Sequence, residues 1–118
     1  MTRINIGYNP KKLTRQHLIA EHREIKRIPN AVRTGKAVIK DTPETFTLGK
    51  GHVRFFYNKL GYLKKRYIKI YNECIKRGYN VQNYSSAWDG IPEELMGDYI
   101  TTTEARKLIE DRINSKLK

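Results

Sequence analysis

An amphipathic stretch over residues 59–76 constrains the fold more than any other feature of this sequence. Its apolar residues recur at spacings of three and four: Leu60, Leu63, Tyr67, Ile70, Tyr71, Cys74 and Ile75. Such a stripe gives a helix one face that must be buried against other elements. Gly78 follows as a natural stop, because glycine accepts the left-handed conformation that ends many helices. The pattern therefore predicts a central helix over 59–76.

Two other segments have helical periodicity. Thr14 is a suitable N-cap for a helix over 15–33, which Pro29 should kink or end because proline lacks a backbone donor. A threonine triplet at 101–103 offers an N-cap for a third helix over 104–116. The segments 1–12, 34–50 and 79–102 are rich in Gly, Pro and Asn and are predicted to be irregular. With no repeat or convincing strand pair, we predict an all-α fold: one compact domain over 1–118, with three main helices and long irregular loops.

The charge of the chain is strongly basic and unevenly distributed. Lys and Arg number 24 against 12 Asp and Glu, which gives a formal net charge of +12. The net charge is +8 over residues 1–40, +6 over 41–78 and −2 over 79–118. A positive face of this strength attracts phosphate backbones. We therefore expect a polyanionic partner; the alternative is a basic surface that only aids solubility.

Several function classes are excluded by what the sequence lacks. No apolar run approaches the roughly 18 residues that a membrane span requires, and the N-terminus has no signal-peptide core. Cys74 is the single cysteine, so an internal disulfide and a cysteine-based zinc site are excluded. The three histidines His17, His22 and His52 do not have metal-ligand spacing. We expect an intracellular protein with no membrane partner, no metal and no cofactor.

The N-terminus is the first place where the sequence offers chemistry. Met1 precedes the small residue Thr2, the setting in which the initiator methionine is usually removed. The exposed α-amine of Thr2 would have a pKa of about 7.7–8.0, against about 10.4 for a lysine. Such an amine is a nucleophile that needs no burial to activate it. The alternative is an inert terminus, as in most proteins.

The second place is the start of the first helix. Four polar side chains are predicted to share one helical face, at spacings of four, three and three: His17, Glu21, Glu24 and Arg27. Arg23 flanks them. A carboxylate among cationic groups stays ionised, so Glu24 could act as a base or stabilise a developing cation. The alternative interpretation is a set of ordinary surface pairs.

Other conspicuous residues have structural interpretations. The Gly-x-Gly sequence at 49–51 could cradle a phosphate, but we favour a tight turn anchored in the core by Phe55 and Phe56. Cys74 is expected to be inert packing, and no role is assigned to Trp88. Three tyrosines are predicted to be core or half-buried residues: Tyr62, Tyr67 and Tyr71.

An ordered series of motifs runs through most of the chain. It comprises MTRIN at 1–5, QHL at 16–18, AEHRE at 20–24, AVR at 31–33, LGKGHVRFFY at 48–57, ECIKRG at 73–78, IP at 91–92 and GDYI at 97–100. This series resembles the pyrimidine-dimer DNA glycosylase family. The resemblance implies a bifunctional enzyme: an N-terminal α-amine attacks the anomeric carbon of the damaged nucleotide, displaces the base, forms a Schiff base and nicks the strand by β-elimination.

The resemblance also implies roles for individual residues. Thr2 corresponds to the residue with the nucleophilic amine and Glu24 to the catalytic glutamate. The DNA-binding residues that it implies around the lesion are Arg3, Gln16, His17, Arg23 and Arg27, with Arg112 and Lys116 on the last helix. The reaction needs no cofactor, and the damaged base is flipped out of the duplex.

The implied partner is double-stranded DNA with damaged or abasic sites, bound by a monomer of viral or bacterial origin. Two alternatives stay open: an inactive DNA-binding protein of the same fold, or an enzyme acting on another modified base or on RNA. The family has a C-terminal segment rich in Trp and Tyr, whereas no aromatic residue follows Tyr99 here. We therefore expect robust nicking of abasic DNA and a weaker preference for dimers than relatives with that segment show.

Overall fold

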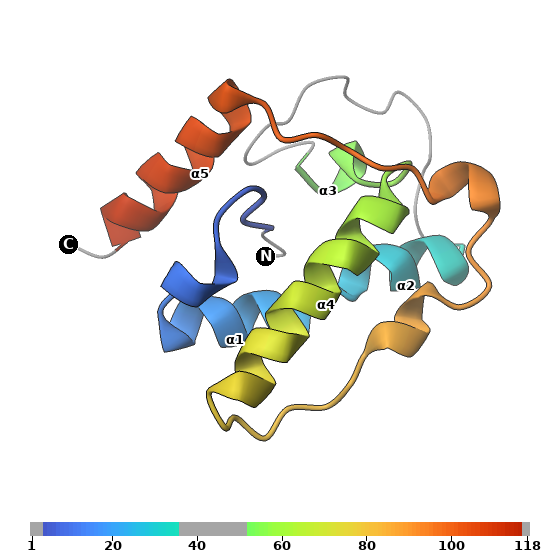
Figure 1. Ribbon diagram of the computed structural model, residues 1–118. Helices are drawn as coiled ribbons and strands as arrows, with labels where there is room; N and C mark the ends of the chain where they lie inside the picture. The colour runs from blue at the N-terminus through green and yellow to red at the C-terminus, as the bar shows by residue number, and fades with distance from the viewer. Residues whose placement is uncertain (1–3, 36–51, 117–118) are drawn as a thin grey trace.

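The computed structural model describes residues 4–35 and 52–116, without the side chains of Arg54 and Lys116. Five helices occur in these ranges (Figure 1): α1 (Arg15–Glu24), α2 (Arg27–Arg33), α3 (His52–Phe55), α4 (Leu60–Lys76) and α5 (Thr103–Lys116). Short 3-10 helices lie at Pro10–Lys12 (η1), Ser85–Trp88 (η2) and Glu93–Leu95 (η3). The described ranges contain no strand, only an isolated bridge between Lys59 and Met96. The predicted all-α fold with three main helices is confirmed, because α1, α4 and α5 are the longest elements.

The helix predicted over 15–33 is two helices, with the break at Ile25 and Lys26. Thr14 caps α1 as predicted, because its hydroxyl oxygen accepts a hydrogen bond from the backbone N–H of His17 at 3.3 Å. Pro29 is the third residue of α2 and has no N–H to donate to the carbonyl of Ile25. That carbonyl instead accepts from the N–H of Ile28 at 3.4 Å. The effect of the proline is therefore a missing helical hydrogen bond to the carbonyl that lies four residues before it.

The buried face of α4 follows the predicted stripe closely. Leu60, Leu63, Ile70 and Cys74 are 0% exposed and Tyr67 is 1% exposed. Ile75 is 49% exposed, so its predicted burial is wrong. The stripe alternates steps of three and four residues, and one residue past Cys74 turns the side chain about 100° away from the core. Gly78 ends the helix with φ 81°, as predicted.

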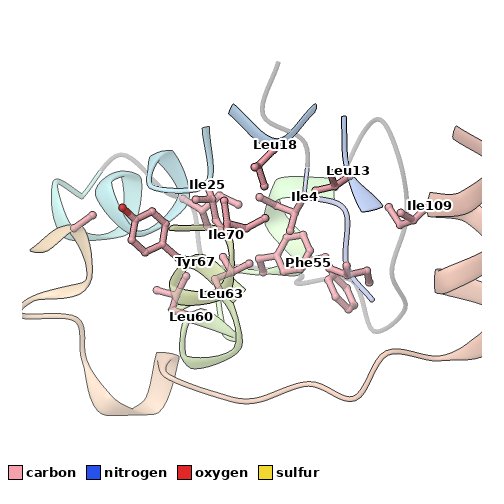
Figure 2. Packing of buried hydrophobic residues seen from close by; sticks show 14 of the residues in the cluster. Ile4, Leu13, Leu18, Ile25, Phe55, Leu60, Leu63, Tyr67, Ile70 and Ile109 are labelled. Atoms are coloured by element: carbon pink, nitrogen blue, oxygen red, sulfur yellow. The ribbon is translucent and has the colours of Figure 1, made fainter. Parts of the chain in front are cut away.

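The core extends well beyond the three long helices (Figure 2). Ile4 and Ile6 of the N-terminal arm, predicted as irregular chain, are fully buried, as are Phe55 and Phe56. Trp88 is 3% exposed, and its Nε1 donates to the carbonyl of Leu60 at 3.0 Å, so it has a packing role that the sequence did not reveal.

The predicted environments of the tyrosines and the cysteine are confirmed: Tyr67 is buried, Tyr62 and Tyr71 are half-buried, and burial raises the pKa of the Cys74 thiol. A search of the described residues finds no helix with the length and hydropathy that a membrane crossing requires.

Candidate active site

A buried ion pair joins the N-terminal arm to α1 and α4. Glu21 of α1 accepts a hydrogen bond from the Asn5 side-chain amide at 2.8 Å and two from Arg66 of α4, one of them from Nη2 at 3.0 Å. The side chains of Glu21 and Arg66 are only 1% and 6% exposed. A buried carboxylate is costly unless it is paired and hydrogen-bonded, and Glu21 is both. The pair therefore anchors the arm, and the burial of Glu21 excludes for this residue the ordinary surface pairing that the sequence left open as the alternative.

Three further contacts hold the same arm. The backbone N–H of Ile4 donates to Nε2 of His52 at 2.9 Å, and the carbonyl of Tyr8 accepts from Arg66 Nη1 at 3.1 Å. Arg112 of α5 donates to the side-chain oxygen of Asn5. The arm has no regular structure before η1, yet residues from α1, α3, α4 and α5 fix it at successive points.

Glu24 lies one turn beyond Glu21 and has different surroundings. Its side chain is 14% exposed, and Arg23, which is 59% exposed, places Nη2 3.6 Å from its carboxylate. Within the described residues, no hydrogen-bond donor reaches the Glu24 oxygens. The carboxylate of Glu21 accepts hydrogen bonds from Asn5 and Arg66, whereas that of Glu24 accepts none from a described residue. It can accept a proton or stabilise a positive charge that forms nearby.

The other predicted site residues that the structure describes on α1 and α2 differ in exposure. Gln16 and Arg23 are exposed on α1, while His17 is half-buried and its Nδ1 lies 3.2 Å from the hydroxyl of Thr14. Arg27 is exposed at the start of α2. The break between α1 and α2 therefore lies between Arg27 and the other three residues of the predicted helical face.

Some predicted residues have a different setting or lie outside the description. Arg112 is half-buried and holds Asn5, so part of its hydrogen-bonding capacity serves the fold. Thr2, Arg3 and the glycine turn at 49–51 lie outside the described residues, as does the side chain of Lys116.

The sequence prediction missed three residues that position the arm: Asn5, His52 and Arg66. Arg66 carried a usable signal, because a charged residue inside the apolar stripe between Leu63 and Ile70 implies a buried partner. Asn5 and His52 carried none, since their partners are 16 and 48 residues away in the sequence.

A second buried cluster ties α1 to α4 and to the segment before η2. The hydroxyl of Tyr67 lies 3.1 Å from Nε2 of His22 and accepts a hydrogen bond from the N–H of Tyr84 at 2.7 Å. Burial lowers the pKa of His22, with the charge of Lys26 acting in the same direction against an opposing backbone hydrogen bond to Gln82. This histidine is therefore a neutral packing group.

Metal ligands do not converge in the described part of the chain. Over 4–35 and 52–116, no group of three or more His, Cys, Asp or Glu side chains could hold a metal ion. Within those ranges, α1 and the start of α2 present the carboxylate of Glu24 beside the exposed arginines Arg23 and Arg27.

A comparison with protein-family models identifies a family that matches most of this chain. The model described as pyrimidine dimer DNA glycosylase matches residues 1–85 of the 118. The matched region contains the N-terminal arm and α1 to α4, and therefore the Glu21–Arg66 pair and Glu24. Helix α5, with Arg112 and Lys116, follows the matched region.

Proposed function

The chain belongs to the pyrimidine dimer DNA glycosylase family, and on that premise we propose that it excises damaged pyrimidines and then nicks the strand as an abasic-site lyase. One observation carries the proposal: the Asn5–Glu21 hydrogen bond of 2.8 Å joins the N-terminal arm to α1 one turn before Glu24. The arm is thereby held beside α1, the helix that bears the Glu24 carboxylate.

Chain geometry supports a meeting of the amine and the carboxylate. Thr2 is three residues before Asn5, a stretch that spans at most about 10 Å. Glu24 is three residues after Glu21, a rise of about 4.5 Å along a helix. An α-amine on Thr2 can therefore reach a sugar that also contacts Glu24. Because buried contacts already order the arm, less entropy is lost when the two groups are positioned on the substrate.

The proposed reaction uses only groups of this chain and water. After removal of the initiator methionine, the amine nitrogen of Thr2 bonds to C1′ while the C1′–N1 bond breaks and its electron pair leaves with the base, which takes up a proton. Opening of the sugar ring gives an imine. Loss of a C2′ proton then breaks the C3′–O3′ bond, the electrons leave with the phosphate oxygen, and water hydrolyses the imine. Glu24 stabilises the cationic sugar or accepts a proton.

Exposed arginines supply the proposed contacts to DNA. Arg23 and Arg27 flank Glu24 in the sequence and are both exposed. Planar guanidinium groups suit bidentate binding of phosphate and the filling of a distorted duplex. The full proposed set is Arg3, Gln16, His17, Arg23, Arg27, Arg112 and Lys116, with double-stranded DNA containing damaged or abasic sites as the substrate.

Single-turnover incision tests this function. Three duplexes of one sequence are compared: one with a single cyclobutane pyrimidine dimer, one with an abasic site and one undamaged. In the dimer strand, we expect cleavage of the C1′–N1 glycosidic bond and then a strand break with a β-elimination end. We expect the abasic strand to be nicked. Specific binding of both lesions without any cleavage would reject the proposal and support the inactive DNA-binding alternative.

A further inference from the structure

A basic groove runs beside α4, with the N-terminal arm and the segment leading into α5 as its other walls. Its volume is about 810 Å³. Five of its lining residues are exposed cations: Lys11, Lys65, Lys69, Lys76 and Arg106. We call this feature the α4 groove.

Among the described residues, most of the positive charge of the α4 groove has no acidic partner. Its two acidic lining residues already have partners: Glu73 accepts from Arg77 at 2.7 Å, and Asp98 accepts from Lys65 at 2.7 Å. Four cations have no ion pair with any described residue: Lys11, Lys69, Lys76 and Arg106. Side chains that repel one another in this way favour an anionic partner.

The spacing of the cations fits a long polyanion. Lys65, Lys69 and Lys76 lie at steps of four and seven residues, so they form one stripe along α4. The stripe is about 16 Å long, and one DNA strand carries a phosphate every 3.4 Å or so along the helix axis. A single small anion would use only a fraction of this length. The half-buried rings of Tyr8, Tyr62 and Tyr99 also line the groove and offer apolar surface to sugars or bases.

The α4 groove is separate from the proposed catalytic face. Its lining includes none of the described side chains assigned above to catalysis or lesion binding: Gln16, His17, Arg23, Glu24, Arg27 and Arg112. On α5, Arg106 of the groove precedes Arg112 by six residues, which places the two side chains about 120° apart around the helix.

We propose that the α4 groove binds the phosphate backbone of a second DNA segment while the catalytic face holds the first. The choice of DNA as the partner rests on the proposed function, whereas the charge and geometry of the α4 groove do not depend on it. Two binding faces on one molecule allow a second segment to engage before the first is released. Dissociation from the first segment then becomes faster as the concentration of the second rises.

Stopped-flow dissociation with matched variants tests this arrangement. The protein is bound to a fluorescent duplex and mixed with increasing unlabelled undamaged duplex or single strand. The groove variant is Lys69→Glu with Lys76→Glu, and the control is Lys64→Glu with Lys107→Glu. Each double substitution lowers the formal net charge from +12 to +8, and none of the four lysines has an ion pair with a described residue. Thermal unfolding confirms that both variants fold.

In the parent and the control variant, the dissociation rate should rise with the concentration of competitor DNA. In the groove variant, the rate should not change with that concentration. The Lys69→Arg, Lys76→Arg variant should keep the rise. An equal loss in groove and control variants would show a bulk charge effect and overturn the proposal. A groove variant that weakens one-to-one binding of the lesion duplex but keeps the rise would place the groove in the first footprint, which also contradicts it. The measurement needs no base excision, so DNA binding in the groove can be tested even if the protein has no glycosylase activity.

Discussion

Glu21 and Glu24 lie one turn apart on α1, but their partners assign them different tasks. The Glu21 carboxylate is surrounded by donors from Asn5 and Arg66 and is nearly inaccessible. The Glu24 carboxylate has Arg23 at 3.6 Å and accepts no hydrogen bond from the residues that the structure describes. The same residue type in the same helix thus serves the fold at one position and is available for chemistry at the next turn.

Paired substitutions separate the two tasks. Glu24→Gln should bind lesion DNA about as well as the parent but lose base excision, with unfolding free energy changed by less than about 0.5 kcal/mol. Glu21→Gln should lower the unfolding free energy by about 3–5 kcal/mol, because it leaves the Arg66 charge buried without its counter-ion. Denaturant unfolding and single-turnover excision measure both. If Glu24→Gln destabilises the fold while Glu21→Gln does not, the assignment is reversed.

The buried His22 predicts how stability depends on pH. Burial lowers its pKa from 6.5 in the folded protein, so below about pH 6.5 the unfolded chain takes up a proton that the folded state resists. The contribution of neutral His22 to the free energy of unfolding is therefore fully present above pH 6.5. It decreases as the pH drops towards the lowered pKa of the folded state. Chemical denaturation at pH 7.5 and 5.0 should show this loss in the parent and a smaller loss in His22→Phe. Identical losses would mean that His22 does not contribute.

At the scale of elements, α4 is built around a close approach of two backbones. A Cβ on Gly61 would lie 2.5 Å from the carbonyl oxygen of Met96, and the N–H of Tyr62 bonds to the carbonyl of Gly97 at 3.0 Å. The segment at 96–97 therefore packs directly on the first turn of α4. Only glycine leaves room for that carbonyl.

Gly61→Ala should consequently destabilise the protein, although alanine is the better helix former. The helix gains about 0.5–1 kcal/mol from the lost glycine, but the clash with a backbone atom costs about 1–3 kcal/mol. Asn72→Ala, on the exposed face of the same helix, is the control and should be neutral or slightly stabilising. Denaturant midpoints compare the two; a Gly61→Ala protein more stable than its parent would contradict this packing.

Helix periodicity predicted the elements well and their long-range partners poorly. The stripe of α4 and the cap at Thr14 follow from local spacing, which a sequence displays directly. The burial of Ile4 depends on contacts with distant elements, so an arm containing Gly7 and Pro10 gave no sign of it. For the site, the catalytic role of Glu24 stays a prediction, and the sequence could not separate Glu21 from it, because the burial of Glu21 depends on Arg66, which is 45 residues away.

At the scale of the whole molecule, the basic charge should act through particular faces. Each phosphate contact contributes about −0.9 to the slope of log binding constant against log salt on duplex DNA. Arg27→Gln should therefore flatten this slope by about one unit. Lys107→Gln removes the same charge from the exposed side of α5 and should leave the slope unchanged. Equal slopes for both variants would remove Arg27 from the interface.

The proposed function depends above all on the α-amine of Thr2 forming the Schiff base. The most direct measurement is borohydride trapping on an abasic duplex, followed by peptide mass mapping of the cross-link. We expect a mature chain without Met1 and a cross-link on the N-terminal peptide, and methylation of the amine should abolish this cross-link. A cross-link that maps to an internal lysine, or trapping that survives with Met1 in place, would contradict this expectation.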